Sequence, residues 1–424
     1  MHFASRLITL CALLVACGGG ESRVSAPETP GPTTPPPGGG VLRTTLSVTV
    51  TPESPDLLIA RALGWPDAIP GATVVLRREG GADVTAQTNA QGVVVFADLV
   101  EGNYQVTASR AFTATDLGKL AATDRDFSAW GGARSVSISN AGGNLPFEVT
   151  AAAARRGSMV FSEILSGGFI TFQPDGTMYN YSGYLELLNN SDTTITLDGM
   201  LLASTNGALR NYGPDHCAVS RDLYADTSGV WADIIYQLPP IGRRLKPGEF
   251  VVVATDGIDH RSFGTRDVYD LSGADFEVYM GLGDVDNPSV PNLISVGTVQ
   301  GHSAYTTHGT DWVELNSAIV IARPQNVSAL LRRPNLAQSH DYLFLPRETL
   351  LDVFTWFRED PRFPPLCAPT VGANIDAAPT IMPAGPLIGT SFHRSRQPGT
   401  SYLKRSRSSA RDYSILTATP FSIP

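Results

Sequence analysis

Short alternating runs of β-branched and apolar residues, separated by turns rich in glycine and proline, constrain this chain more than any other feature. From Val41 onward the sequence reads LRTTLSVTV, then ATVVLRR, GVVVF and EGNYQVTAS. Alternation with a period of two is typical of half-buried strands, and 41 Gly and 31 Pro residues favour short strands over long helices. We expect an all-β fold, with helices confined to short pieces near Asp116–Phe127 and Pro346–Leu351.

The length of 424 residues exceeds that of one ordinary β-domain and predicts two globular units with an additional tail. Hydrophobic residues make up 42% of the chain, which is enough for real cores. The formal net charge of −9 argues against nucleic acid or an anionic bilayer surface as the main partner.

Residues 1–16 have the pattern of a secretory signal. Arg6 precedes an apolar run that continues to Ala16 and leads directly into Cys17. The run is too short to span a bilayer as a mature helix. Its Leu-Val-Ala-Cys ending resembles a bacterial lipobox, which implies that Cys17 is acylated and becomes the first residue of the mature chain. The alternative is an ordinary cleaved signal in which the cysteine is incidental.

Residues 17–41 are expected to form the lipidated cysteine and a disordered tether. The segment from Glu21 to Gly40 reads ESRVSAPETPGPTTPPPGGG and contains almost no large apolar residue. Such a segment cannot bury a core and stays semi-extended. A tether of this kind lets a folded body meet its partners beside the membrane.

Two cysteines, Cys217 and Cys367, remain in the folded body after the signal and the anchor are set aside. Two thiols in an oxidising compartment favour one disulfide. The alternative is a pair of buried thiols, because the sequence does not show that the two Cα atoms approach each other.

Residues 42–154 resemble the carboxypeptidase-regulatory-like, prealbumin-like β-sandwich. The string PGATVVL, then TNAQGVVVFADL, then EGNYQVTAS carries that resemblance. The positions that match the family pattern are Gly71, Val74, Gly92, Phe96, Leu99, Gly102, Tyr104 and Val106. The resemblance implies a fold and no activity.

Residues 157–424 are predicted to form a second β-unit with long loops. The stretch GYLELLNNSDTTITLDGMLLAS resembles the lamin-tail domain, an immunoglobulin-like sandwich. The matching positions are Tyr184, Glu186, Leu187, Asn189, Leu197, Gly199 and Leu202. A hairpin is expected around Asp175-Gly176, between ITF and TMYNY. The fold class is therefore two tandem β-sandwich units after a disordered tether.

The end of the chain looks like that of an uncharacterised family of bacterial surface lipoproteins, a domain of unknown function. Ser391, Arg394, Ser409, Asp412 and Tyr413 follow the order of that family's tail, whereas Ser-Arg-Ser replaces its Asp-Thr-Asn portion. The resemblance implies a working association with outer-membrane uptake receptors and no known reaction.

The same tail carries six Lys or Arg residues between His393 and Arg411. This run predicts either a basic surface patch for phosphates or a solvated edge strand protected by charge. The sequence leaves both interpretations open.

Asp284, Asp286 and Asn287 form the best metal candidate in the sequence. Two carboxylates and an amide on a tight loop before a proline are hard oxygen ligands that suit Ca²⁺. The segment lacks the glycine and the distal glutamate of an EF-hand loop. Because Asp and Asn also form ordinary turns, a plain turn is the alternative. The sequence indicates no other cofactor.

Asp256, Asp259 and His260 follow the strand-like VVVA segment, and His302 lies on a later loop. Loops of this kind project side chains from a rigid scaffold, so these four residues are candidates for a binding site. Ordinary surface loops are the alternative. The sequence contains no HExxH motif, no G-x-S-x-G elbow and no phosphate-binding P-loop.

Together these patterns predict a non-enzymatic lipoprotein of the bacterial envelope, placed at the outer membrane by its lipid anchor. It would act as a binding or scaffolding component, accessory to an outer-membrane uptake receptor or to a cell-surface polymer. The alternative is a secreted metal-dependent hydrolase, of the phosphoesterase or nuclease kind, or its targeting module. The first interpretation is favoured because β-units account for nearly all residues after the tether.

Overall fold

The computed structural model describes residues 43–421 with internal gaps, and residues 1–42 and 422–424 lie outside it. The internal positions that are not described are 79, 122–124, 140, 141, 156, 158, 166–170, 173–177, 180–182, 206–227, 233, 263–267, 280–285, 297–317, 335–340, 359–370, 383–389 and 407. Strands dominate the described residues and helices are short, which confirms the predicted all-β fold. None of the helices in these residues is long and apolar enough to cross a membrane.

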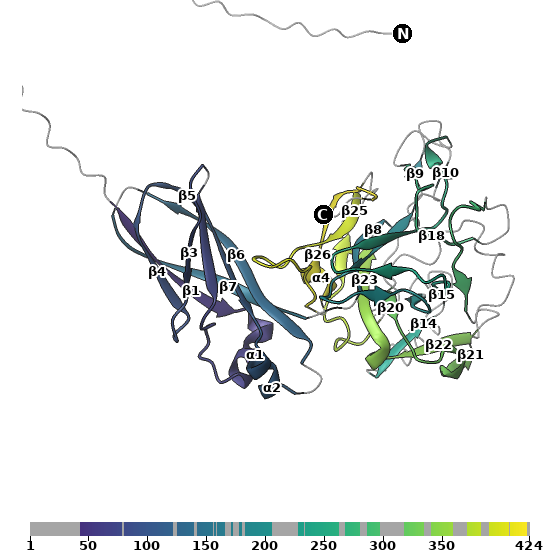
Figure 1. Ribbon diagram of the computed structural model, residues 1–424, viewed down its shortest axis with the longest axis horizontal. Coiled ribbons are helices and arrows are strands. Elements are labelled where there is room, and N and C mark those ends of the chain that lie inside the picture. Colours follow the sequence, from purple (N-terminus) through teal and green to yellow (C-terminus); the bar gives the residue numbers. More distant parts are fainter. Residues whose placement is uncertain are drawn as a thin grey trace, which may run out of the picture. The chain divides into compact units, whose positions relative to one another are not determined.

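The first sheet has the strand order β3-β2-β5-β6-β7-β1-β4 in the described residues (Figure 1). Its strands are β1 Thr44–Pro52, β2 Thr73–Arg78, β3 Val84–Gln87, β4 Val93–Leu99, β5 Gly102–Ala111, β6 Phe127–Ile138 and β7 Gly143–Arg155. The long strand β7 changes partner along its length. Residues 143–151 pair with β1, whereas residues 152–155 pair with β6. The strand therefore joins the two halves of the sheet.

Both halves of this sheet contribute to one apolar core. In β1, buried side chains alternate with partly exposed ones along the whole strand, as the period-two pattern predicts. Leu46 and Val48 of β1 pack in the same cluster as Val106 of β5 and Trp130 of β6. Burying side chains of this size stabilises a fold by about 1.5–3 kcal/mol each.

Gly92 lies in the turn that precedes β4, where the backbone requires glycine. Its φ of +73° lies in the left-handed region that side chains rarely adopt. A Cβ atom at this position would also lie 2.5 Å from the Cβ of Ala68. The turn before β4 is therefore closed to any larger residue.

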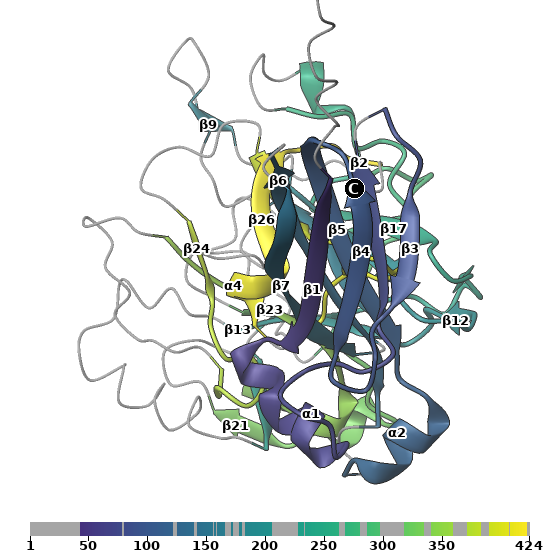
Figure 2. The same ribbon diagram turned by 90° about the vertical axis from the view of Figure 1, so that its left-hand side faces the viewer.

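Two short helices, α1 (Leu57–Ala62) and α2 (Ala114–Lys119), lie at the same end of the first sheet (Figure 2). Thr113 and Asp116 form a capping box that starts α2, within the stretch where the sequence predicts helical character. The prediction missed α1, because six residues between two proline-containing turns are too few to show a helical period.

Two six-stranded sheets make up most of the rest of the described chain. The first of these two six-stranded sheets has the strand order β18-β17-β11-β8-β25-β26. The second has the order β19-β15-β13-β20-β23-β24. The strands of the first are β8 Met159–Leu165, β11 Tyr184–Asn189, β17 Phe250–Ala254, β18 Phe276–Glu277, β25 Thr390–Arg394 and β26 Tyr413–Thr417. Those of the second are β13 Leu201–Thr205, β15 Ile234–Gln237, β19 Ile294–Ser295, β20 Ala318–Ala322, β23 Leu350–Arg358 and β24 Thr380–Met382.

Smaller sheets complete this region. They are the pairs β9 (Thr171–Phe172) with β10 (Met178–Tyr179) and β12 (Ile195–Thr196) with β16 (Arg244–Leu245), and the triple β14 (Gly229–Ala232), β22 (Asp341–Pro346) and β21 (Arg332–Pro334). Because β9 and β10 are antiparallel, the predicted hairpin around Asp175-Gly176 is confirmed, although the turn itself lies outside the described residues.

The two six-stranded sheets share one apolar core. Leu187 of β11 and Val253 of β17 belong to the same cluster as Leu202 of β13 and Ile321 of β20. The second sheet is also covered on its other face, where Val320 packs in a cluster with residues of β14 and β22. Burial on both faces explains why β20 and the first three residues of β13 are apolar without alternation.

The last strand of the seven-stranded sheet, β7, ends at Arg155, and the next strand along the chain, β8, begins at Met159. The assignment of residues 42–154 and 157–424 to two sandwich units of named families stays a prediction. The lipidated segment, residues 17–41, lies outside the described residues.

Candidate functional site

The basic tail of the chain is buried at one of its arginines and not along its whole length. Arg396 is exposed and Lys404, Arg405 and Arg411 are partly exposed, as a solvated surface would have them, whereas Arg394 is buried. Arg394, the last residue of β25, is fully buried. Its Nη2 lies 2.5 Å from Oδ2 of Asp352 and 2.5 Å from the hydroxyl of Tyr413, and its Nη1 lies 3.3 Å from Oδ2 of Asp412. Burial opposes the charged guanidinium, but the two carboxylates outweigh it and raise the pKa of Arg394.

Backbone carbonyls complete the environment of this guanidinium. The Nε of Arg394 donates to the carbonyl of Phe161 at 2.9 Å, and its Nη1 donates to the carbonyl of Lys404 at 2.8 Å. The Tyr413 ring lies under the guanidinium, 4.5 Å from Cζ to the ring centroid, and its hydroxyl also donates to Phe161. Arg394 thus ties β8, β23, β26 and the tail loop together.

A second buried carboxylate anchors the short helix α4 (Ser409–Asp412). Asp376 accepts hydrogen bonds from the hydroxyls of Ser409 and Thr355, and from the backbone N–H of Ser409 at 2.9 Å. Burial raises the pKa of the Asp376 carboxyl, although these hydrogen bonds oppose the shift. All five tail positions that carry the family resemblance therefore lie in buried strands or in this helix.

A third buried cluster surrounds Glu163 of β8, which is fully buried. Its Oε1 accepts hydrogen bonds from the hydroxyls of Tyr184 and Ser391 at 2.5 Å each, and from the backbone N–H of Thr419 at 2.9 Å. Burial and the neighbouring carboxylate raise the pKa of the Tyr184 hydroxyl far above its usual value. The phenol is therefore held as a hydrogen-bond donor.

Ser391, His393 and Glu163 resemble the residue types of a hydrolytic triad, but their geometry differs from it. The Ser391 hydroxyl lies 2.9 Å from Nε2 of His393, and Oε1 of Glu163 lies 3.3 Å from the same nitrogen. A triad needs the carboxylate on the opposite ring nitrogen, so that the histidine is oriented as a base toward the serine. Both side chains are also closed to solvent. The cluster is a structural network.

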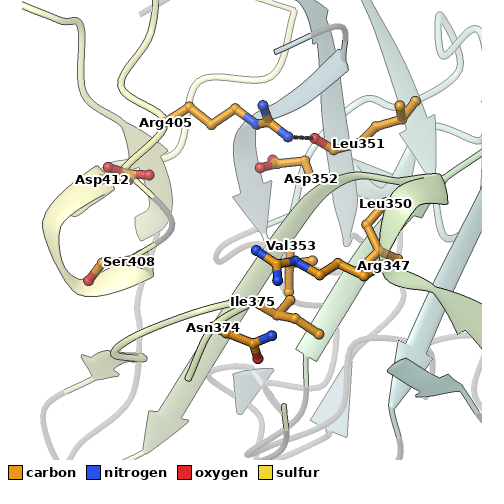
Figure 3. A pocket seen from close by; sticks show the side chains of 10 residues that line it. All are labelled: Arg347, Leu350, Leu351, Asp352, Val353, Asn374, Ile375, Arg405, Ser408 and Asp412. Carbon is orange, nitrogen blue, oxygen red and sulfur yellow. Dashed lines mark hydrogen bonds between the residues drawn. The ribbon is translucent and has the colours of Figure 1, made fainter. Parts of the chain in front are cut away.

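A pocket of about 80 Å³ opens beside the Arg394 network (Figure 3). It is lined by the start of β23, by the residues after Lys404 and by α4, so that tail and sheet together form its wall. The lining residues are Arg347, Leu350, Leu351, Asp352, Val353, Asn374, Ile375, Arg405, Ser408 and Asp412.

Two hydrogen-bond donors in this pocket have no partner among the described residues. The first is the guanidinium of Arg347, in the short 3₁₀ turn Arg347–Thr349, which Figure 3 shows between Asp352 and Asn374. The second is the hydroxyl of Ser408, which precedes α4 without capping it and is 4% exposed. Arg347 is partly exposed and Ser408 is buried, so the first donor can be reached from solvent and the second from the pocket.

The other charged groups of the pocket are already engaged. Asp412 accepts from the backbone N–H of Ser406 at 2.9 Å and from its hydroxyl at 2.7 Å, in addition to Arg394. Arg405 donates to the carbonyl of Leu351 at 2.6 Å. Burial lowers the pKa of Arg405, because the nearby carboxylates offset its desolvation only in part.

Charge counting gives this site a net positive character. Three guanidinium groups, those of Arg347, Arg394 and Arg405, face the two carboxylates of Asp352 and Asp412. Asp126, which lies 3.6 Å from Arg405, is paired with Arg155. One positive charge, that of Arg347, is therefore left without a counter-ion in the described structure.

A larger groove, of about 340 Å³, lies between the Asn189–Asp192 turn and the tail loop. Its asparagines are used internally. The Asn190 amide donates to the carbonyl of Leu403 at 3.1 Å and accepts from its N–H at 2.8 Å, and the Asn189 amide donates to the carbonyls of Thr193 and Leu245. Asn189 and Asn190 therefore fix the turn that follows β11.

The candidate binding residues after the VVVA strand lie close together, but their side chains are engaged in contacts that stabilise the loop itself. His260 is fully buried, and its Nε2 lies 2.9 Å from the carbonyl of Asp256. Burial lowers the pKa of His260. Asp259 accepts both Nε and Nη2 of Arg261 at 2.8 Å, and this ion pair lowers its pKa to about 2. His302 lies outside the described residues.

The candidate calcium loop is described only in part, because Asp284 lies outside the described residues. The Asp286 carboxylate accepts from the amide of Asn292 at 2.9 Å, and the Asn287 amide donates to the carbonyl of Gly257 at 2.6 Å. The buried carboxylate of Glu277 accepts the N–H groups of Asn287 and Gly257. No group of three metal-binding side chains occurs among the residues that are described. The calcium site stays a prediction.

Cys17, Cys217 and Cys367 lie outside the described residues, so lipidation and the disulfide also stay predictions. The sequence alone gives no signal for Arg347, Ser408 or Asp352 as residues of a site. No local motif marks them, because their partners come from segments far apart in the chain.

Part of the chain matches a family model. Residues 246–419 match the model of a family described as "Protein of unknown function (DUF4876)". No curated protein matches the chain. A crystal structure of a DUF4876 family protein from Bacteroides thetaiotaomicron is similar over 88% of this chain and 94% of its own, at 16% identity and a TM-score of 0.50. This likeness concerns the fold alone.

Other solved structures are similar over smaller parts. Klebsiella pneumoniae 5-hydroxyisourate hydrolase covers 26% of this chain and 92% of its own length, at 24% identity and a TM-score of 0.16. The Bacillus anthracis TIE protein covers 50% of this chain and 28% of its own, at 10% identity and a TM-score of 0.18. Scores this low support no conclusion about this chain. Residues 246–419 thus match a family of unknown function, and the chain has an all-β fold.

Proposed function

We propose that this protein is a non-catalytic binding or scaffolding component of the bacterial envelope. The observation that carries the proposal is the pocket beside Arg394. Its frame is fixed by internally paired charges, while Arg347 and Ser408 face it without a partner among the described residues. Rigid frames that present a few unpaired donors are typical of binding sites.

The polar clusters of the interior support binding over catalysis. Glu163 and Asp376 each accept hydrogen bonds that fix neighbouring strands or turns. A general acid or base must reach a substrate proton, and these carboxyl groups are buried. Asp376 also holds α4, which forms one wall of the pocket.

The envelope location rests on the amino-terminal sequence. Acylation at Cys17 would anchor the chain, and the proline-rich segment after it would let the folded body reach a partner beside the membrane. The proposed partner is an outer-membrane uptake receptor, which is the association that the lipoprotein resemblance implies.

The test uses the full-length lipoprotein and a Cys17→Ser variant, both made in a diderm bacterium. Chemical crosslinking in intact cells followed by mass spectrometry should connect the wild-type body to one outer-membrane receptor, and the variant should lose that link. The same purified protein is incubated with a phosphodiester and with Ca²⁺, Mg²⁺ or Zn²⁺. Metal-dependent turnover that follows the protein through purification would overturn the binding proposal in favour of a hydrolase.

A further inference from the structure

We infer that the pocket beside Arg347 binds the carboxylate group of a ligand with a short aliphatic stem. The inference deepens the proposed binding function and rests on it. It names a site and a ligand class that neither the family match nor the amino-terminal sequence supplies.

The donor set of the pocket suits an oxyanion. Arg347 presents a planar guanidinium, which can donate two parallel hydrogen bonds to one carboxylate. Ser408 lies on the opposite wall, beside α4. Because Ser408 is almost fully buried, a ligand oxygen that reaches it is shielded from water, which strengthens the interaction.

The charge of the pocket selects a monoanion over a phosphate. One positive charge is uncompensated, whereas the carboxylates of Asp352 and Asp412 also line the wall. A dianionic phosphate would therefore meet repulsion from two carboxylates. A single carboxylate neutralises Arg347 without adding a second negative charge.

The size and the remaining wall indicate the stem. A cavity needs about 10–15 Å³ by this measure to hold one water, so about 80 Å³ holds roughly five to eight water-sized groups. Leu350, Val353 and Ile375 supply an apolar side, and all three pack against the same buried cluster. A carboxylate attached to one or two methylene groups matches both the volume and this apolar side.

The experiment measures binding of propionate to the purified protein by calorimetry, with propionamide and inorganic phosphate as comparison probes. A capped Gly-Glu-Gly peptide forms a second arm, which separates a free short acid from an acidic side chain. We expect saturable binding of propionate, of the peptide or of both. Propionamide, which lacks the charge, and phosphate should bind at least about tenfold more weakly.

Arg347→Gln should weaken carboxylate binding by at least about tenfold, and Ser408→Ala by a few-fold. Neither change removes a hydrogen bond from the described fold, so both variants should unfold as the wild type does. Arg332→Gln is the matched control, because Arg332 is an exposed arginine outside the pocket. It should leave binding unchanged.

Three results would overturn the assignment. They are propionate and propionamide binding equally, phosphate binding more tightly than both carboxylates, and Arg347→Gln binding like the wild type. Failure of carboxylate binding while the crosslink to an envelope receptor persists removes this assignment and leaves the proposed function standing. If the crosslink is absent while propionate binds, the proposed envelope function is removed and the carboxylate site stands.

Discussion

Replacing Arg394 tests the claim that the basic tail is a structural element. Methionine keeps a long flexible side chain but removes the charge and every hydrogen bond of the guanidinium. Asp352 and Asp412 would then remain buried without their shared cation. Removing one partner of a buried ion pair costs about 3–5 kcal/mol, because the remaining charge is left uncompensated.

The structure places the Arg394→Met variant well inside that range. The guanidinium also donates to the carbonyls of Phe161 and Lys404, which would lose their partner. We expect the free energy of unfolding to fall by about 4 kcal/mol. Urea denaturation followed by tryptophan fluorescence measures this loss, because Trp356 is buried in the same core.

Two further variants complete this test. Arg332→Met removes an exposed arginine and should change the free energy of unfolding by less than about 0.5 kcal/mol. Adding Asp352→Asn to Arg394→Met should recover part of the lost stability, since one uncompensated charge is removed. A loss below about 1 kcal/mol for Arg394→Met would refute the reasoning, and so would equal losses for the two arginines.

Four other expectations can be measured. Cys17→Ser should move the protein from the detergent phase to the aqueous phase, whereas membrane retention without an acyl mass would contradict lipidation. An unreduced digest should contain the Cys217–Cys367 peptides joined by a disulfide, and free alkylation of both thiols would exclude it. Burial lowers the pKa of His260, so the unfolded state binds its proton first and the free energy of unfolding should fall as pH drops below about 6.5. His260→Gln should flatten that dependence, and an unchanged pH profile would show that His260 does not cause it. If calcium binds the loop, thermal stability should rise by about 2.7 kcal/mol at a hundredfold excess over Kd and Asp286→Ala should abolish the rise, whereas a calcium-insensitive melting curve leaves a turn.

The period-two pattern was sufficient to predict the strands of the first sheet, because half-buried strands such as β1 show their buried face in the sequence. The helix α1 was missed, since six residues carry too little periodicity. Turn chemistry was also visible, as Gly92 shows with its positive φ. These features depend on residues close together in the chain.

The tail shows what local patterns cannot predict. Arg394 lies two residues after Phe392, so both are on the same face of β25, and Phe392 belongs to the core. This alternation can be predicted from the sequence. The carboxylates that make the burial of Arg394 tolerable, Asp352 and Asp412, lie 42 and 18 residues away. Without them, a run of six basic residues indicates a solvated surface.

The pocket was beyond prediction for the same reason. The short turn at Arg347 falls within the predicted helical piece, so its backbone was foreseen. Its free side chain becomes meaningful only when α4 brings Ser408 to the opposite wall. That meeting depends on Asp376, which fixes α4 through Ser409.

Hydrogen–deuterium exchange with and without propionate tests most directly that this pocket is a ligand site. Our account predicts slower exchange in the segments that form its walls, residues 347–353 and 404–412, and no change at the calcium-loop candidate Asp286–Asn292. The Arg347→Gln variant should show no protection at the same propionate concentration. Unchanged exchange in both wall segments of the wild-type protein at saturating propionate would contradict the account, and so would protection confined to another part of the chain.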